Sequence, residues 1–289
     1  MKTKIRIVYA LPLVILPALA VAFGGGGARW AWMWWIAFAL FFACKCLTLL
    51  EIQSGFPLKD CLAYFLLWPG MDAQAFFNRT KPDRAGRALG RAAFRNMLAG
   101  GLLLVAAGAL LEKGQVGLAA LAGMAGPIFL LHFGLFHLLT LLCRRAGRPV
   151  ESLMDNPAAA RSLAEFWGRR WNRGFNHLIR VYVFNPLTGV LKPAHALLFS
   201  FLVSGWIHEL VITLPAGGGY GGPTLYFLAQ GLGVMLEKHA FLRHRPKTRR
   251  VWTLLWVTLL FPLLFPPVFV RNIIFPMLHA WGITQGVPV

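Results

Sequence analysis

Long apolar segments are the feature that most constrains the fold of this chain. A helix needs about 20 mostly apolar residues to cross a membrane. Segments that approach or exceed this length cover residues 7–23, 30–50, 97–111, 116–143, 194–214, 223–236 and 251–270. Two shorter apolar stretches, residues 62–71 and 273–281, are interpreted as re-entrant or interfacial. The runs are long rather than alternating, so they predict an all-α transmembrane helical bundle with about 7–9 membrane segments.

The composition excludes the main alternative classes of protein. Apolar residues make up 57% and charged residues 13% of the chain, whereas soluble domains average about 45–50% and about 25%. Four cysteines in 289 residues are too few for a disulfide scaffold, and 11 Trp with 23 Phe exclude a disordered chain. The net charge of +19 raises the question of nucleic acid. The basic residues lie between apolar segments, however, so the membrane surface explains them and no nucleic-acid partner is expected.

The basic residues also predict the orientation of the chain in the membrane. Of 29 Lys and Arg residues, 22 lie in residues 1–6, 79–95, 144–180 and 243–250. With seven spans these four segments share one side, which the positive-inside rule assigns to the cytoplasm together with the N-terminus. The first apolar segment lacks a convincing small-residue cleavage site and is expected to be a retained helix. The abundance of Ala, Arg and Gly suggests a bacterial source, and hence the inner membrane.

Residues 161–185 have the pattern of one amphipathic helix at the cytoplasmic face. Ser162 and Glu165 have the spacing of a capping box at its start. Apolar side chains recur every three to four residues along it. A second stripe at helical spacing carries Arg169, Arg173 and Arg180, with Asn176 between them. The helix either binds anionic lipid at the interface or uses its arginines to hold the phosphates of a substrate.

His208 and Glu209 are adjacent ionisable residues inside an apolar segment. Such residues are costly at membrane depth and usually functional. Because burial disfavours the imidazolium form, His208 is expected to be neutral and able to accept a proton as a general base. Glu209 points about 100° away around the helix, so it need not be the partner of His208.

Two motifs in this part of the chain resemble a known family. The stretch SLAEFWGRRWN at residues 162–172 and the stretch FLVSGWIHEL at residues 201–210 look like the membrane-bound O-acyltransferase superfamily, in its wax-synthase-like branch. The stretch LLWPGMD at residues 66–72 is similar to an upstream segment of that branch. Asn172 and His208 lie 36 residues apart. Motif resemblance covers residues 60–240.

The resemblance implies a helical fold around a tunnel and a reaction that needs no metal and no cofactor, with acyl-CoA as a substrate. It implies a buried histidine and an asparagine that closes the first motif, which map to His208 and Asn172; Asn176 is a second candidate for the asparagine. His208 is expected to remove the proton of the hydroxyl acceptor, and Asn172 to stabilise the oxyanion or to position His208. The candidates for binding acyl-CoA are Arg169, Arg170, Arg173, Trp167 and Trp171.

The expected activity is acyl transfer from acyl-CoA to a lipophilic alcohol, within one membrane-embedded domain over residues 1–289 whose catalytic segment spans about 160–240. The sequence carries Gly168, Arg169 and Arg170 where some relatives have an acid and a second Trp, which leaves the acceptor open. A sugar or secondary-metabolite hydroxyl is the alternative acceptor. A transporter or lipid-handling protein without chemistry is a second alternative, but it gives no reason for His208 and Asn172 at this spacing.

Overall fold

The computed structural model describes residues 7–52, 55–81, 86–237 and 246–284. All of the secondary structure in these ranges is helical, which confirms the predicted all-α class. The chain divides into two compact units, residues 1–153 with 274–289 and residues 154–273. Each unit is described by itself below. The expectation of a single acyltransferase domain stays a prediction.

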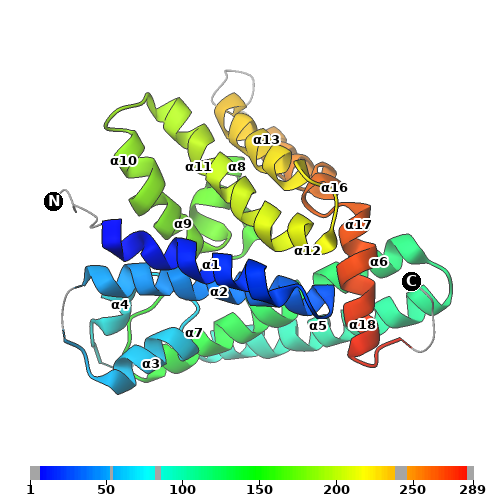
Figure 1. Cartoon of the computed structure of the whole chain (residues 1–289), viewed down its shortest axis with the longest axis horizontal. Coiled ribbons are helices and arrows are strands. Elements are labelled where there is room, and N and C mark those ends of the chain that lie inside the picture. The colour runs from blue at the N-terminus through cyan, green and yellow to red at the C-terminus, as the bar shows by residue number, and fades with distance from the viewer. Residues whose placement is uncertain (1–6, 53–54, 82–85, 238–245, 285–289) are drawn as a thin grey trace. The chain divides into compact units, whose positions relative to one another are not determined.

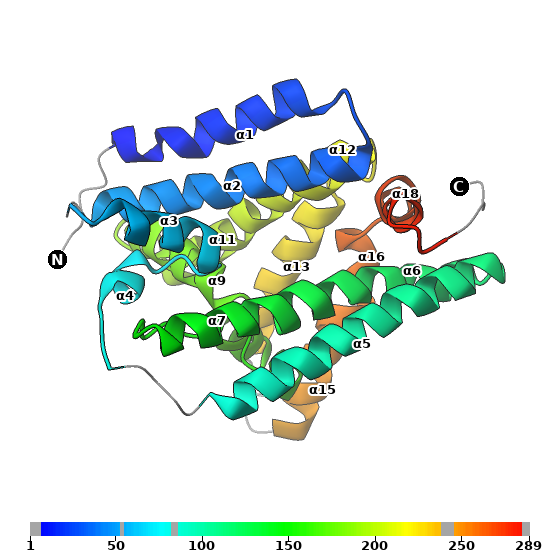
Figure 2. The same ribbon diagram turned by 90° about the horizontal axis from the view of Figure 1, so that it is seen from below.

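The first unit is built from long helices joined by short turns. Its helices are η1 (Ile7–Ala10), α1 (Leu11–Gly24), α2 (Arg29–Glu51), α3 (Leu58–Leu67), α4 (Ala73–Phe77), α5 (Arg87–Glu112), α6 (Val116–Pro127), η2 (Ile128–Leu135), α7 (Phe136–Arg145) and α18 (Phe275–Ala280). A glycine-rich turn places α1 beside α2 (Figures 1 and 2). Another turn, in which Gly114 takes a left-handed φ of 71°, reverses the chain between α5 and α6.

A buried lysine explains the single charge inside the second apolar segment. Lys45 is fully buried in α2, and its ammonium donates hydrogen bonds to the carbonyl oxygens of Tyr64 at 3.0 Å and Trp68 at 2.5 Å. These carbonyls lie at the C-terminal end of α3, where helices leave carbonyl groups unpaired and carry partial negative charge. Lys45 therefore caps α3 and fixes the start of the segment that follows it.

The second unit contains shorter and more irregular helices. They are η3 (Pro157–Ala159), α8 (Leu163–Glu165), η4 (Phe166–Arg170), α9 (Arg173–Ile179), η5 (Arg180–Phe184), α10 (Asn185–Leu187), α11 (Pro193–His208), η6 (Glu209–Thr213), α12 (Leu214–Ala216), α13 (Gly222–Leu236), α15 (Pro246–Leu259), α16 (Phe261–Leu264), α17 (Pro267–Phe269) and η7 (Val270–Ile274). Helices α11 and α13 lie side by side (Figure 1). Gly205 permits this approach, because a Cβ atom there would lie 2.7 Å from the Cα atom of Thr224.

The predicted number of membrane segments is not confirmed. Among the described residues, the helices long and apolar enough to span a membrane are Arg29–Glu51, Arg87–Glu112, Val116–Arg145 and Pro193–Ala216. A fifth candidate is the pair Lys247–Leu264 and Pro267–Ala280, bent by 62° where consecutive prolines interrupt the helix. The expected spans at 7–23 and 223–236 contain α1 and α13, which have 14 and 15 residues and fall short of a full crossing.

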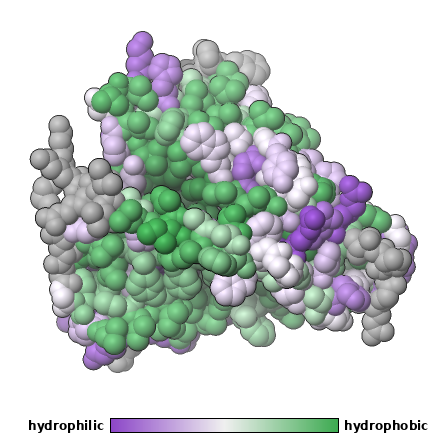
Figure 3. Space-filling model, in the orientation of Figure 1, coloured by the Kyte–Doolittle hydropathy of each residue, from purple (hydrophilic) through white to green (hydrophobic). Residues whose placement is uncertain are grey.

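The surface is apolar in the way that a membrane requires. Large apolar side chains are exposed along α5, among them Phe94, Leu98 and Leu102. The space-filling view also shows apolar residues over much of one face (Figure 3). Because water-soluble proteins rarely expose contiguous apolar area of this kind, the helices are those of an integral membrane protein.

Candidate active site

A cavity of about 380 Å³ lies within the second unit. Its lining comes from α8, η4, α9, η5, α11 and α13 and from the turn between η4 and α9. The volume is within the range of about 300–1,000 Å³ that ligand pockets occupy. The cavity brings together His208, Asn172, Arg169, Trp167 and Trp171 from the predicted site.

The first motif begins with the predicted capping residue. The Oγ atom of Ser162 accepts a hydrogen bond from the backbone N–H of Glu165 at 2.9 Å, which confirms the N-cap. The Glu165 carboxylate accepts from the backbone N–H of Arg161 at 2.8 Å, one residue before the cap, rather than from Ser162 as a capping box would have it. This bond and the Arg170 guanidinium hold the pKa of Glu165 below its ordinary value, although partial burial of the carboxylate acts in the opposite direction.

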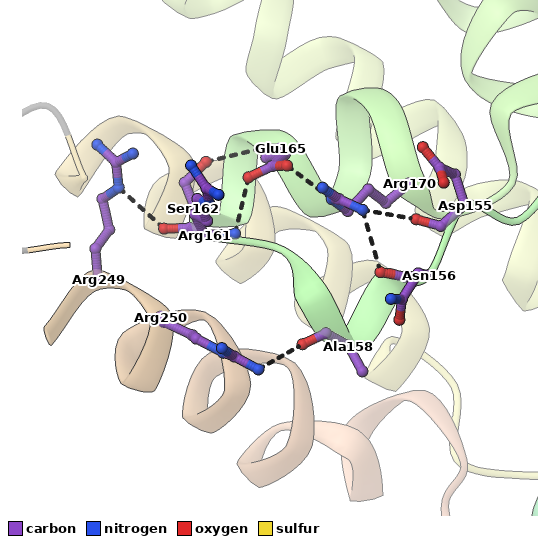
Figure 4. Close-up of polar contacts among 9 residues, drawn as sticks. All are labelled: Asp155, Asn156, Ala158, Arg161, Ser162, Glu165, Arg170, Arg249 and Arg250. Atoms are coloured by element: carbon purple, nitrogen blue, oxygen red, sulfur yellow. Dashed lines mark hydrogen bonds and ion pairs between the residues drawn. The ribbon is translucent and has the colours of Figure 1, made fainter. Parts of the chain in front are cut away.

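Arg170 is engaged away from the cavity. Its Nε donates to the Glu165 carboxylate at 2.7 Å, and its Nη1 donates to the carbonyl oxygens of Asp155 at 3.0 Å and Asn156 at 3.4 Å (Figure 4). Arg170 thus holds the loop before α8 against η4. Arg173, also predicted to bind acyl-CoA, is half-buried in α9, and neither arginine is among the cavity-lining residues.

The single amphipathic helix predicted for residues 161–185 is wrong, because the helix is broken at Trp171 and Asn172. Trp171 is extended and Asn172 is left-handed, with φ 42° and ψ 60°. Asn is one of the few residues other than Gly that tolerates this conformation. The Oδ1 atom of Asn172 then accepts from the backbone N–H of Phe175 at 3.2 Å and caps α9. The break places the Asn172 side chain at the cavity.

The hydrogen bonds of Asn172 and Asn176 separate the two candidates for the asparagine role. Both line the cavity. The Oδ1 of Asn172 is used by the helix cap, which leaves its Nδ2 donor for a ligand. Asn176 uses its Nδ2 to donate to the carbonyl oxygen of Trp167 at 3.0 Å, which leaves its Oδ1 acceptor. A developing oxyanion needs a donor, so the geometry favours Asn172.

The His208 ring is held with one nitrogen committed and the other available. His208 is the last residue of α11, and its Nδ1 lies 2.7 Å from the carbonyl oxygen of Ser204. A carbonyl only accepts, so Nδ1 carries the proton and the neutral ring presents the lone pair of Nε2. The Phe227 ring packs against the imidazole, with the ring centroids 4.4 Å apart. This arrangement suits a general base.

Glu209 has partners of its own, as its position around the helix predicts. Its carboxylate accepts from the hydroxyl of Thr213 at 2.6 Å and from the backbone N–H and hydroxyl of Thr224 at 3.0 and 2.8 Å. These bonds tie η6 to the first turn of α13, the helix that carries Phe227. Glu209 therefore stabilises the α11–α13 pair.

A row of hydrogen bonds fixes Trp167 in the cavity wall. Its indole Nε1 donates to the Oε1 of Gln230 at 3.1 Å, and the Nε2 of Gln230 donates to the carbonyl oxygen of Trp256 at 3.1 Å. Gln230 is fully buried. Edge-on or tilted contacts with Phe201 and Phe227 complete the surroundings of the indole. The apolar end of the cavity therefore has rigid aromatic walls.

Two arginines line the cavity without a carboxylate partner in the described ranges. They are Arg169 on η4 and Arg180 at the start of η5, and both are exposed. The sequence placed Arg180 on the arginine stripe, but Arg180 was not among the predicted binding residues. Both give the lining of the cavity positive charge, which suits phosphate groups.

Other lining residues were not predicted. Ser204 and Ser200 lie one and two turns before His208 on α11, and a search of the sequence for polar residues at this helical spacing would have found them. The π-helical turns η4, η5 and η6, which are frequent at functional sites, had no signal in the hydrophobic pattern. Within the described residues, no group of three His, Cys, Asp or Glu side chains is placed to hold a metal ion.

The segment that forms the cavity is similar to known proteins. Residues 150–229 match the model of the membrane bound O-acyl transferase family. The chain is 32% identical to probable long-chain-alcohol O-fatty-acyltransferase 9 of Arabidopsis thaliana over 152 residues, which cover 47% of this chain and 45% of the relative. It is 30% identical to probable long-chain-alcohol O-fatty-acyltransferase 7 of the same plant, over 44% of this chain and 42% of the relative.

A relative from a second plant is similar over a shorter segment. The chain is 33% identical to the long-chain-alcohol O-fatty-acyltransferase of Simmondsia chinensis over 72 residues, covering 22% of this chain and 20% of the relative. The matched part of the chain spans less than half the length of each of these relatives. The resemblance read from the two motifs is confirmed.

Proposed function

Because residues 150–229 match the model of the membrane bound O-acyl transferase family, we propose that this protein transfers a fatty acyl group from acyl-CoA to a long-chain alcohol. The product is a wax ester. The named activity of the plant relatives supports this proposal.

The observation that carries the proposal is the convergence of complementary groups on one cavity. His208 offers an unprotonated Nε2, Asn172 offers an amide donor, and Arg169 and Arg180 offer positive charge. Acyl transfer to a hydroxyl needs a base, an oxyanion donor and a site for an anionic carrier. A lipid transporter needs none of these in combination.

The chemistry follows from these positions. Nε2 of His208 removes the proton of the alcohol as its oxygen attacks the thioester carbonyl. The Nδ2–H of Asn172 stabilises the negative charge that develops on the carbonyl oxygen. The tetrahedral intermediate then expels the CoA thiolate, which takes the proton back from the imidazolium, and ester and free CoA are released. Arg169 and Arg180 bind the phosphates of CoA at the exposed end of the cavity.

The location of the site in the cell is part of the proposal. We place the N-terminus and the basic segments on the cytoplasmic side of a bacterial inner membrane, where acyl-CoA is available. Residues 1–6 and parts of the segments at 79–95 and 243–250 lie outside the described residues. The described arginines of residues 154–180 and 249–250 fall in segments that this orientation assigns to one side.

The proposal is tested by a product screen. Purified protein in nanodiscs receives labelled palmitoyl-CoA with, separately, long-chain alcohols, diacylglycerol, sterol and simple sugars, and products are identified by mass spectrometry. We expect a wax ester that falls by about 10²–10⁴-fold in His208→Ala, the range for loss of a general base. The matched control is His195→Ala, an exposed histidine on the same helix.

The outcomes separate the alternatives. A His208-dependent ester with a sugar instead of an alcohol would transfer the proposal to the second acceptor class. Folded protein that releases no CoA with any acceptor would refute acyl transfer from acyl-CoA.

A further inference from the structure

Three arginines gather on the surface of the second unit, apart from the cavity lining. The Nε of Arg249 donates to the carbonyl oxygen of Arg161 at 3.1 Å, and the Nη2 of Arg250 donates to that of Ala158 at 3.4 Å (Figure 4). Backbone carbonyls thus hold α15 beside the loop that precedes α8. Arg161, Arg249 and Arg250 are called the arginine cluster below.

The carboxylates near the arginine cluster are occupied by other donors. Glu165 accepts from the Arg161 backbone N–H and from the Arg170 side chain. Glu237 is buried and accepts from the backbone N–H groups of Leu163 and Ala164. In the part of the chain that the structure describes, no arginine of the cluster forms an ion pair. Its positive charge is therefore not neutralised by contact with a protein carboxylate.

The position of two cluster arginines on α15 makes this charge costly. Lys247, Arg249 and Arg250 all lie near the N-terminus of the helix, and its first turn contains no acidic residue. The N-terminal end of a helix carries partial positive charge and favours anions. Cations there raise the free energy of the folded protein unless an anion from outside binds between them.

The arginine cluster lies at the start of an apolar segment. Lys247–Leu264 belongs to the bent helix pair that is apolar enough to cross a membrane, and Arg249 and Arg250 stand near its beginning. Basic residues at the surface of a membrane attract anionic lipids at about 1 kcal/mol each.

We propose that the arginine cluster is a binding site for the phosphate group of an anionic phospholipid. The cavity has its own arginines, Arg169 and Arg180, so the cluster is not needed for the pyrophosphate of CoA. Arg249 uses its Nε and Arg250 its Nη2 for the two backbone carbonyls, and their other guanidinium N–H groups are the donors for the lipid phosphate. A bound lipid phosphate stabilises the contact between α15 and the loop before α8. This proposal does not depend on the acyl-transfer activity.

The test measures lipid binding directly. Phosphatidylglycerol is titrated into the full-length protein in neutral detergent, and bound lipid is counted by native mass spectrometry, with phosphatidylcholine as the neutral probe. We expect preferential binding of phosphatidylglycerol and a loss of roughly 20-fold to 30-fold in its affinity in Arg249→Gln/Arg250→Gln. The variant Arg249→Lys/Arg250→Lys keeps the charges and is expected to retain most of the binding.

A matched control removes two exposed cations elsewhere. Lys113→Gln/Arg271→Gln lowers the net charge equally and is expected to bind phosphatidylglycerol nearly as the unchanged protein does. An equal loss in this control would show unspecific attraction and overturn the proposal. Unchanged phosphatidylglycerol affinity in folded Arg249→Gln/Arg250→Gln would overturn it too. If that variant instead weakens CoA but not dephospho-CoA, the phosphate belongs to the substrate and not to a lipid.

Discussion

The hydrogen bond between Trp167 and Gln230 gives a quantitative test of how the cavity wall is held. Replacing Trp167 by Phe keeps an aromatic ring but leaves the buried Oε1 of Gln230 without its donor at 3.1 Å. Replacing Gln230 by Leu leaves the indole N–H without its acceptor and also frees the carbonyl oxygen of Trp256. Each single substitution therefore buries an unpaired polar group.

The magnitude follows from the burial of Gln230, which is fully shielded from solvent. An unsatisfied buried group costs about 1–3 kcal/mol. In the double variant Trp167→Phe/Gln230→Leu both partners of the bond are absent, so neither is left unpaired by the loss of the other. The double variant is thus expected to lose less free energy of unfolding than the two single variants together, by about 1–3 kcal/mol.

The assay is the free energy of unfolding in mixed micelles, measured for the four proteins of the cycle. Trp206→Phe provides the control cycle with Gln230→Leu, because Trp206 is exposed on α11 and contacts Phe199 instead. The changes in the free energy of unfolding caused by Trp206→Phe and Gln230→Leu are expected to be additive. Strict additivity in the Trp167 cycle would show that the bond contributes nothing and refute the reasoning.

Three further predictions concern the site and its surroundings. Asn172→Ala is expected to lower kcat by roughly 10²-fold or more, as for loss of one oxyanion donor, and single-turnover kinetics measures it. Arg169→Gln/Arg180→Gln is expected to raise KM for acyl-CoA in a salt-dependent way, whereas Arg173→Gln, which is not in the cavity lining, is the control. Because the pKa of Glu165 is lower in the folded than in the unfolded protein, its ionised carboxylate stabilises the fold at pH values above the unfolded-state pKa of about 4. This stability is lost as the pH falls through the folded-state pKa. Glu165→Gln is therefore expected to lower the unfolding temperature at neutral pH and to have little effect in acid, and an equal effect at both pH values would count against the ion pair.

Local chemistry in the sequence correctly predicted parts of the secondary structure around the candidate site. The apolar runs predicted the helical class, and Ser162, three residues before Glu165, predicted the start of α8. The apolar segment around His208 correctly predicted that this residue lies on a long helix, which is α11. These features depend on neighbours within one or two turns, which a sequence displays directly.

Features that depend on distant neighbours were missed. The hydrophobic period continues across Trp171 and Asn172, so it gives no sign of the left-handed turn that divides the predicted helix. The roles of the arginines also depend on tertiary contacts, since Arg170 is held by a loop while Arg180 faces the cavity. The predicted number of membrane segments is not confirmed, because prolines and short helices interrupt apolar runs that hydropathy alone joins.

The π-helical turns around the cavity have a consequence for how relatives of this chain are aligned. A π turn contains one residue more than the α turn it replaces. Deleting one residue within Glu209–Thr213 would therefore convert η6 to an α turn and leave the helix after it in nearly its present orientation, whereas the same deletion in a regular α turn would rotate everything after it by about 100°. The same holds for Phe166–Arg170 and Arg180–Phe184. Single-residue gaps inside helices are thus to be expected among relatives at these three places, and a relative with such a gap keeps the side chains on either side of the turn in nearly the same positions.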